Sequence, residues 1–186
     1  ALVIGQMAVE EKTNEIPKLP ELLGPLPLQG AVVTAVALHT QHDTARFIVE
    51  KKQADYLFIV KDNQSTLRND IKTLNLSAFP PAHTTIDKAH GRLELRHVWT
   101  STELNNYLAF PHVAQCFCIQ RDITKLVNGK QHTETVYGVT SLTPDHADPE
   151  RILNLARGHW AIENRLHWVR DVTFDEDRSQ VRKGNG

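Results

Sequence analysis

The chain has 186 residues, of which 40% are hydrophobic and 23% are charged, as expected for one globular domain with a single core. Its 21 Lys and Arg residues nearly balance 22 Asp and Glu residues, so the overall charge does not indicate a protein that is held to nucleic acid by charge alone. No apolar run reaches the roughly 18 residues of a membrane helix, and the start lacks a basic segment that leads into an apolar one. We therefore expect a cytoplasmic protein with no membrane partner.

An apolar strand and a short helix are predicted at the start of the chain. Residues 1–9 are strand-like and contain no initiator methionine at the first position. Residues 12–30 place Pro and Gly around helically spaced leucines, which predicts a short helix. At the other end, Gly184 to Gly186 follow a helical run directly. We expect both ends to be cuts in a longer domain.

A parallel pair of strands is predicted next. Residues 31–38 form an unbroken apolar run, which is typical of a central strand buried on both faces. Asp43 or Thr44 can cap a helix that continues to Gln53. Residues 55–61 then form a second buried strand. A strand, a helix and a strand in this order imply parallel pairing.

An amphipathic helix and an antiparallel sheet are predicted in the middle of the chain. The helix covers Gln64 to Leu74, and a proline break follows it. Three β-rich runs come next, and we expect antiparallel strands at 92–101, 113–122 and 133–142. Asn128-Gly129 between the last two is a strong hairpin signal. Cys116 and Cys118 alternate along the second run, which favours two buried thiols over a disulfide.

A long helix that begins at Asp148 or Pro149 is predicted to close the chain. Its apolar stripe contains Ile152, Leu155, Ile162, Leu166 and Val169. His159 falls on the same face of the helix. His159, Glu163 and His167 recur every four residues, which leaves a zinc-type hydrolase as an alternative. Because His159 lies in the apolar stripe, a core histidine is the favoured interpretation.

Local clusters of basic residues are the candidates for DNA contacts, with a solvated surface as the alternative for each. They are Arg46, Lys51 and Lys52; Lys88, Arg92 and Arg96; and Arg178, Arg182 and Lys183.

Several strings in the chain are characteristic of one family. They are KTNEIPKLPELLG, AVVTAVALHTQ, KDNQ, AHGRLELR and ARGHWAIENRLHWVRDVTFDEDRSQVRKGNG. The last is the most specific, since it joins Trp and His residues at fixed offsets. Over nearly its whole length the chain resembles the H-repeat-associated, or ISAs-type, insertion-sequence transposases of the DDE superfamily.

This resemblance implies an α/β fold of the ribonuclease-H-like type, a mixed sheet flanked by helices. It implies one partial catalytic domain over residues 1–186, with a β-rich insertion at 82–143 before the closing helix and with the first strands missing. In such enzymes three acidic residues hold two divalent ions, Mg²⁺ or Mn²⁺, which drive DNA cleavage and strand transfer.

The resemblance also assigns the acidic positions. Glu163 corresponds to the carboxylate of the closing helix, and Asp171 lies two turns further along as a weaker candidate for the metal shell. The second acidic position is occupied by Val36, and the first falls before Ala1. Asp43 in the next helix is the alternative ligand. One carboxylate cannot hold two magnesium ions against water, so we expect a catalytically defective fragment that binds no metal stably.

The predicted DNA-binding residues carry basic or amide side chains in the matching strings. They are Asn14, Gln64, His90, Arg92, Arg96, Arg178, Arg182 and Lys183. Capping a helix or closing a turn is the alternative role for Asn14 and Gln64, and a plain turn is the alternative for His90.

The main hypothesis is therefore a transposase catalytic-domain fragment whose partner is the DNA at the element ends. The alternative is a non-catalytic module that occupies DNA, or joins a second copy or an intact transposase, and so interferes with transposition.

Overall fold

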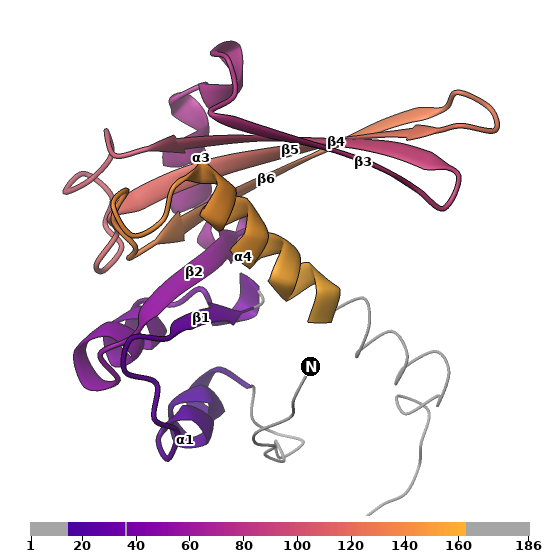
Figure 1. Cartoon of the computed structure of the whole chain (residues 1–186). Coiled ribbons are helices and arrows are strands. Elements are labelled where there is room, and N and C mark those ends of the chain that lie inside the picture. The colour runs from indigo at the N-terminus through magenta and orange to yellow at the C-terminus, as the bar shows by residue number, and fades with distance from the viewer. Residues whose placement is uncertain (1–14, 36, 163–186) are drawn as a thin grey trace, which may run out of the picture.

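The computed structural model describes residues 15–35 and 37–162. Its sheet has the strand order β1-β2-β6-β5-β4-β3. The strands are β1 (Val32–Ala35), β2 (Asp55–Val60), β3 (His83–Ala89), β4 (Arg92–Ser101), β5 (Gln115–Lys125) and β6 (Gln131–Thr140). The α-helices are α1 (Leu19–Leu23), α2 (His42–Arg46), α3 (Ser65–Thr73) and α4 (Pro149–Ile162). Figure 1 shows α4 lying across the sheet.

The predicted parallel pair is confirmed, because β1 and β2 run side by side from Val32 opposite Asp55 to Ala35 opposite Phe58. The first strand is shorter than expected, since a 3-10 turn occupies Ala37–His39. Within the described sheet β1 is the outermost strand and its first three residues are only half-buried. The prediction of a central strand is therefore not met there. An apolar run indicates a strand but does not determine whether that strand lies at the centre or at the edge of the sheet.

The helix between these strands begins earlier than predicted. Gln41, in an extended conformation, is the N-cap of α2, so the prediction that Asp43 or Thr44 caps the helix is wrong. Thr44 is instead buried inside α2. The helix widens into a π-helical turn at Phe47–Lys51, and Gln53 adopts φ +50° just before β2. The helix is therefore confirmed over 42–51, but it ends two residues before the predicted Gln53.

The three predicted antiparallel strands are present as β4, β5 and β6. Gly129, at φ +66°, lies in the predicted hairpin turn between β5 and β6. The strand β3 was missed, and its signal was the turn that follows it. His90 and Gly91 both have positive φ, at +49° and +71°, as in a two-residue hairpin turn of type I′.

The antiparallel strands continue the sheet of the parallel pair. β6 pairs with β2 from Thr140 opposite Leu57 to Tyr137 opposite Val60. The rest of β6 and the ends of β3, β4 and β5 extend past β2 as a twisted arm, which projects to the right in Figure 1.

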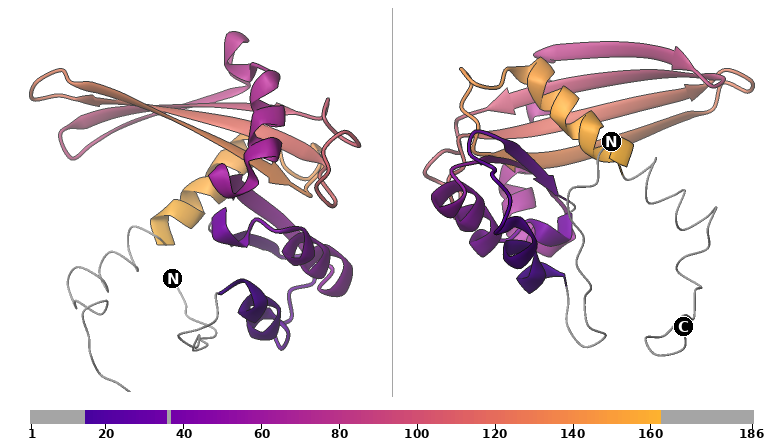
Figure 2. Two further views of the ribbon diagram at one scale, coloured as in Figure 1. Left: turned by 180° about the vertical axis from the view of Figure 1, so that it is seen from behind. Right: turned by 60° about the horizontal axis from the view of Figure 1, so that its bottom comes forward.

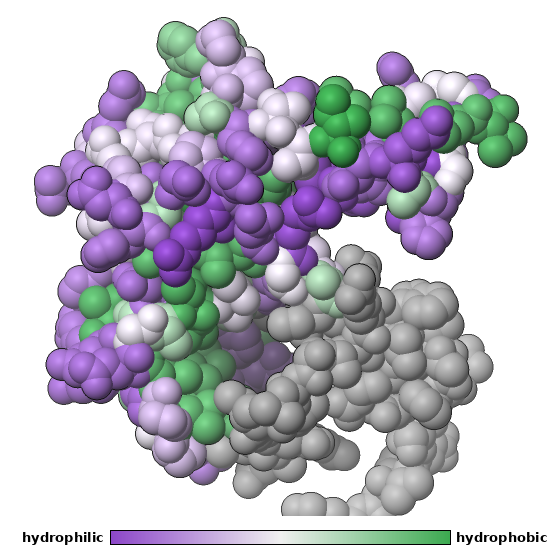
Figure 3. Space-filling model, in the orientation of Figure 1, coloured by the Kyte–Doolittle hydropathy of each residue, from purple (hydrophilic) through white to green (hydrophobic). Residues whose placement is uncertain are grey.

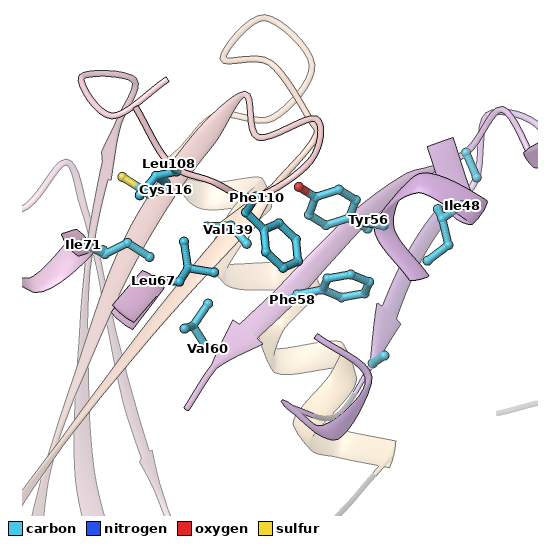
Figure 4. Close-up of a cluster of buried hydrophobic side chains, with 13 residues drawn as sticks. Ile48, Tyr56, Phe58, Val60, Leu67, Ile71, Leu108, Phe110, Cys116 and Val139 are labelled. Carbon is cyan, nitrogen blue, oxygen red and sulfur yellow. The ribbon is translucent and has the colours of Figure 1, made fainter. Parts of the chain in front are cut away.

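Two apolar clusters pack on opposite faces of β2. Tyr56, Phe58 and Val60 pack with residues of α2 and α3 on one face, as Figure 4 shows. Leu57 and Ile59 face a second cluster. That cluster contains Phe117 and Ile119 of β5 and Ile152, Leu153 and Ala156 of α4. The alternation along β2 therefore fixes α4 over one face of the sheet, a position that Figure 2 shows from two further sides.

The predicted start of α4 and the predicted burial of the two cysteines are confirmed. Asp148 Oδ1 accepts a hydrogen bond from the Arg151 backbone N–H at 2.8 Å, which is the geometry of a helix N-cap. Cys116 and Cys118 are buried free thiols, and burial raises the pKa of each to about 11. None of the helices in the described ranges is long and apolar enough to cross a membrane.

Candidate functional site

The carboxyl ends of β1 and β2 meet at one edge of the sheet, which is where α/β proteins commonly place their sites. Side chains that follow β2 hold the segment that follows β1. Asn63 Nδ2 donates to the Ala37 carbonyl at 2.7 Å, and Gln64 Nε2 donates to the Thr40 carbonyl at 2.9 Å. Thr40 Oγ1 in turn donates to the Ile59 carbonyl at 2.8 Å. The backbone just after position 36 is thus anchored to β2.

These contacts give Gln64 a defined internal role. It is the N-cap residue of α3, but its side chain makes no capping hydrogen bond and reaches Thr40 instead. Its amide also lies 3.4 Å from Gln41 Oε1. The predicted DNA contact of Gln64 stays a prediction, and the alternative of helix capping by its side chain is not what the structure has.

His39 is a residue of this edge that the sequence did not single out. Its side chain is mostly buried, and its Nε2 lies 3.4 Å from Glu15 Oε2. Its Nδ1 is buried without a hydrogen-bond partner among the described residues. Only its position directly after an apolar strand could have drawn attention to it.

A cavity of about 430 Å³ lies between α4 and the sheet, next to the end of β2. Its polar lining is mainly cationic, with Lys61, Arg96, Arg121 and Arg157 facing a single carboxylate, Glu134. Its apolar lining consists of Ile59, Ile119, Val136, Trp160 and Ala161. The cavity therefore combines basic side chains with an apolar lining.

An ion-pair network crosses the sheet beside this cavity. Glu94 is buried and contacts Arg96, Arg92 at 2.9 Å and Arg121 at 3.0 Å. Burial alone raises the pKa of Glu94, but the hydrogen bond and charge of Arg121, with the charges of Arg96 and Arg92, outweigh burial and hold this pKa below its ordinary value. Asp87 on β3 joins the network through Arg96.

Arg157 extends the network to the helix, because its Nη2 lies 3.1 Å from Asp87 Oδ2. The network therefore connects β3, β4, β5 and α4. Arg121 also contacts Glu134 on β6 at 3.2 Å.

The predicted DNA-binding residues do not come together in one place. Gln64 lies at the strand ends, whereas His90, in the turn between β3 and β4, and Arg92, the first residue of β4, lie at the far end of the sheet. Arg96 is only 8% exposed and its guanidinium contacts two carboxylates. The other predicted residues fall outside the described ranges: Asn14, Val36, Glu163, His167, Asp171, Arg178, Arg182 and Lys183.

The first predicted basic cluster has contacts within the protein. Arg46 Nη1 lies 3.4 Å from Asp43 Oδ1, and Lys52 Nζ donates to the Gly24 carbonyl at 2.8 Å. These contacts fit the solvated surface that was the alternative interpretation.

The residues near the strand ends do not match a two-metal site. In the part of the chain that the structure describes, no three His, Cys, Asp or Glu side chains gather as ligands. Asp62 is almost fully exposed and pairs with Arg68 at 3.0 Å. Asp43, the alternative ligand, is also exposed and pairs with Arg46. Hard divalent ions need several converging oxygen atoms, and the described donor set does not supply them.

Comparison with known proteins places the chain in a family. Residues 1–186 match the family described as "Transposase DDE domain". The chain belongs to the DDE transposase family. "H repeat-associated putative transposase YhhI" of Escherichia coli strain K12 is 32% identical over 197 residues, which cover 100% of this chain and 51% of that protein. "H repeat-associated putative transposase YbfD" of the same strain is 39% identical over 105 residues, covering 52% of this chain and 40% of that protein.

This membership confirms the family that the sequence motifs indicated. The six-stranded mixed sheet with helices on both faces is consistent with the ribonuclease-H-like fold of DDE transposases. DDE transposases generally use divalent metal ions. The chain spans about half the length of the full-length curated relatives it matches.

Proposed function

We propose that the chain is part of the catalytic domain of an insertion-sequence transposase and that it acts on the DNA at the ends of the element. The observation that carries this proposal is the family match over residues 1–186. The parallel strand ends support it, because they place an anchored loop beside Lys61, a basic residue that lines the cavity under α4.

We also propose that residues 1–186 form a single domain with residues 82–143 as a β-rich insertion. The pairing of β6 with β2 supports one domain, since the antiparallel strands share a sheet with the parallel pair. The insertion supplies Arg96 and Arg121, two of the four cationic residues around the cavity.

We infer that the chain by itself does not cut DNA. In intact relatives bound metal ions would activate the attacking oxygen, but position 36 here holds a valine. Glu163, with Asp171 as a weaker candidate, leaves too few carboxylates for two ions. The functions that remain for this chain are to bind DNA and to hold it against the sheet.

A nicking assay tests this loss of catalysis. We expect no conversion of a supercoiled plasmid carrying element ends to the nicked form, in either Mg²⁺ or Mn²⁺, above a buffer control. Nicking that disappears in Glu163→Ala would overturn the inference, because it would require a working acidic site. Nicking that persists in Glu163→Ala identifies a contaminating nuclease and leaves the inference standing.

The alternative function is a non-catalytic module that occupies DNA or joins a second copy or an intact transposase. The observation that favours it is the group of basic side chains around the cavity, where Lys61 joins three arginines that are paired with carboxylates of the ion-pair network. Retention of DNA on immobilised chain should fall steeply as salt rises, because bound phosphates release counterions. Absence of retention at low salt, together with no capture of an intact transposase, eliminates this alternative.

A further inference from the structure

The far end of the β arm places two loops side by side. They are the β3–β4 turn with its flanks, residues 88–92, and the β5–β6 loop with its flanks, residues 125–132; together we call them the arm end. The Leu126 backbone N–H donates to the Gly91 carbonyl at 2.9 Å, so the two loops are joined. All residues of the arm end are exposed.

The arm end is positively charged although the whole chain is not. Its two segments contain Lys88, Arg92, Lys125 and Lys130, together with His90 and His132, and no Asp or Glu. Arg92 stands directly opposite Lys125 in the pairing of β4 with β5. Arg92 is also paired with Glu94 at 2.9 Å, so Lys88, Lys125 and Lys130 supply the charge for an anionic partner.

Apolar side chains project from the same loop. Val127 is 93% exposed and Leu126 is 48% exposed. Such side chains at the tip of a projecting hairpin have no core to enter. Figure 3 shows the corresponding apolar surface at the projecting end of the molecule.

The loop that carries these side chains is held by its own hydrogen bonds. The Gly129 N–H donates to the Lys125 carbonyl at 2.8 Å, and the Lys125 N–H donates to the Lys130 carbonyl at 2.9 Å. Asn128 Oδ1 accepts from the Lys130 N–H at 3.0 Å. The loop therefore presents Val127 in a fixed position, which lowers the entropy cost of binding.

We propose that the arm end is a DNA contact in which its lysines bind phosphates and Val127, with Leu126 behind it, wedges between base pairs from the minor groove. Proteins that bend DNA commonly insert apolar side chains in this way and hold the flanking phosphates with basic residues. The lysines on either side of the apolar pair match that arrangement. This inference rests on the proposed function, since it takes DNA as the substrate.

DNA suits the arm end better than a membrane does. Two apolar residues bury too little surface to hold a protein on a bilayer, whereas one wedged side chain is enough to unstack a base step.

The test uses the full chain and two measurements on a closed circular plasmid. The first is the salt dependence of binding. The second is the change in linking number after relaxation by a topoisomerase in the presence of the chain, because a wedge unwinds the duplex.

The variants are the double substitution Lys125→Gln with Lys130→Gln and the single substitution Val127→Ser. Matched controls are Lys72→Gln with Arg151→Gln, two exposed basic residues outside the candidate clusters, and, for an exposed apolar side chain elsewhere, Phe79→Ser. Circular dichroism establishes that each variant is folded.

We expect the Lys125 and Lys130 double variant to lower the slope of log affinity against log salt by about 1.8, at about 0.9 per lost phosphate contact. We expect Val127→Ser to keep that slope and to lose the linking-number change. Both control variants should behave like the unaltered chain.

The two proposals fail in different ways. If the unaltered chain binds DNA and the arm-end lysine variant matches its control, the arm-end contact is refuted while the proposed function stands. If Val127→Ser keeps the linking-number change, the wedge is refuted. If the unaltered chain does not bind DNA at low salt, the proposed DNA-binding function and this inference fall together.

Discussion

Glu94 is the most densely contacted carboxylate of the sheet face that carries the ion-pair network. Its side chain is buried and lies against Arg92, Arg96 and Arg121. Removing a buried acid leaves its partners with uncompensated charge, which usually costs more than the pair contributes. Arg96 keeps Asp87 and Arg121 keeps Glu134, so part of the charge stays compensated.

We predict that Glu94→Gln lowers the free energy of unfolding by about 2–3 kcal/mol. Urea unfolding followed by circular dichroism measures the change. Glu134→Gln is the matched control, because that side chain is 46% exposed and its loss should cost well under half as much. Equal effects of the two substitutions would contradict a central role for Glu94.

The lowered pKa of Glu94 also predicts an acid-sensitive stability. Because this pKa is below the ordinary value of 4.5 in the folded chain, the group stabilises the fold above pH 4.5 and loses that contribution as pH falls through its folded pKa. The free energy of unfolding of the unaltered chain should fall more steeply below pH 4.5 than that of Glu94→Gln. Parallel pH profiles for the two proteins would refute the assignment.

At the level of single elements, β6 depends on one close approach to β5. A Cβ atom at Gly138 would lie 2.1 Å from the ring of Phe117, which is fully buried. Phe117 stands directly opposite Gly138 in the sheet, so its ring covers the glycine. The ring cannot move aside without disturbing the cluster under α4.

Gly138→Ala should therefore destabilise the chain by about 1–3 kcal/mol, as overpacking in a core does. Thermal unfolding measures the loss. Gly158→Ala is the control, since an added Cβ there meets no atom within 4 Å and alanine favours a helix interior. A Gly138→Ala variant as stable as Gly158→Ala would refute the close approach.

The sequence predicted the helices and strands better than it predicted the contacts and burial of individual side chains. The parallel pair, α3, the β5–β6 hairpin and the start of α4 follow from local signals in apolar periodicity, turn residues and capping. The strand β3 was missed because its residues are mostly polar and exposed at an edge, so it lacks the apolar pattern of a buried strand.

The candidate site was less predictable for a physical reason. The Asn63 and Gln64 amides donate to backbone carbonyls more than 20 residues earlier in the chain. Contacts between residues so far apart leave no periodic pattern in the sequence. Arg96 was expected on the surface because it is basic, but its neighbours supply two carboxylates that make its burial favourable. The family resemblance, not periodicity, indicated position 36 and Glu163, and their predicted roles stay predictions.

For the molecule as a whole, the sheet joins the parallel pair to the antiparallel strands without a break. The joint is the pairing of β2 with β6, and both faces of β2 carry apolar clusters. A domain built around one such strand is expected to lose its two clusters together.

We predict one cooperative unfolding transition. Tryptophan fluorescence, which includes Trp99 on β4 and Trp160 on α4, should give the same urea midpoint as far-ultraviolet circular dichroism, which reports on all elements. Two separated midpoints would show that the β-rich segment and the rest of the chain fold independently, against the proposal of a single domain.

The anchoring of the Ala37 carbonyl by Asn63 has a consequence for the neighbouring position. On either side of position 36 the backbone is held by contacts within the protein, by strand pairing at Ala35 and by an amide at Ala37. We propose that these contacts hold the loop whether position 36 carries a valine or the acid that the family resemblance implies. Val36→Asp would then place a carboxylate next to backbone that is already anchored on both sides.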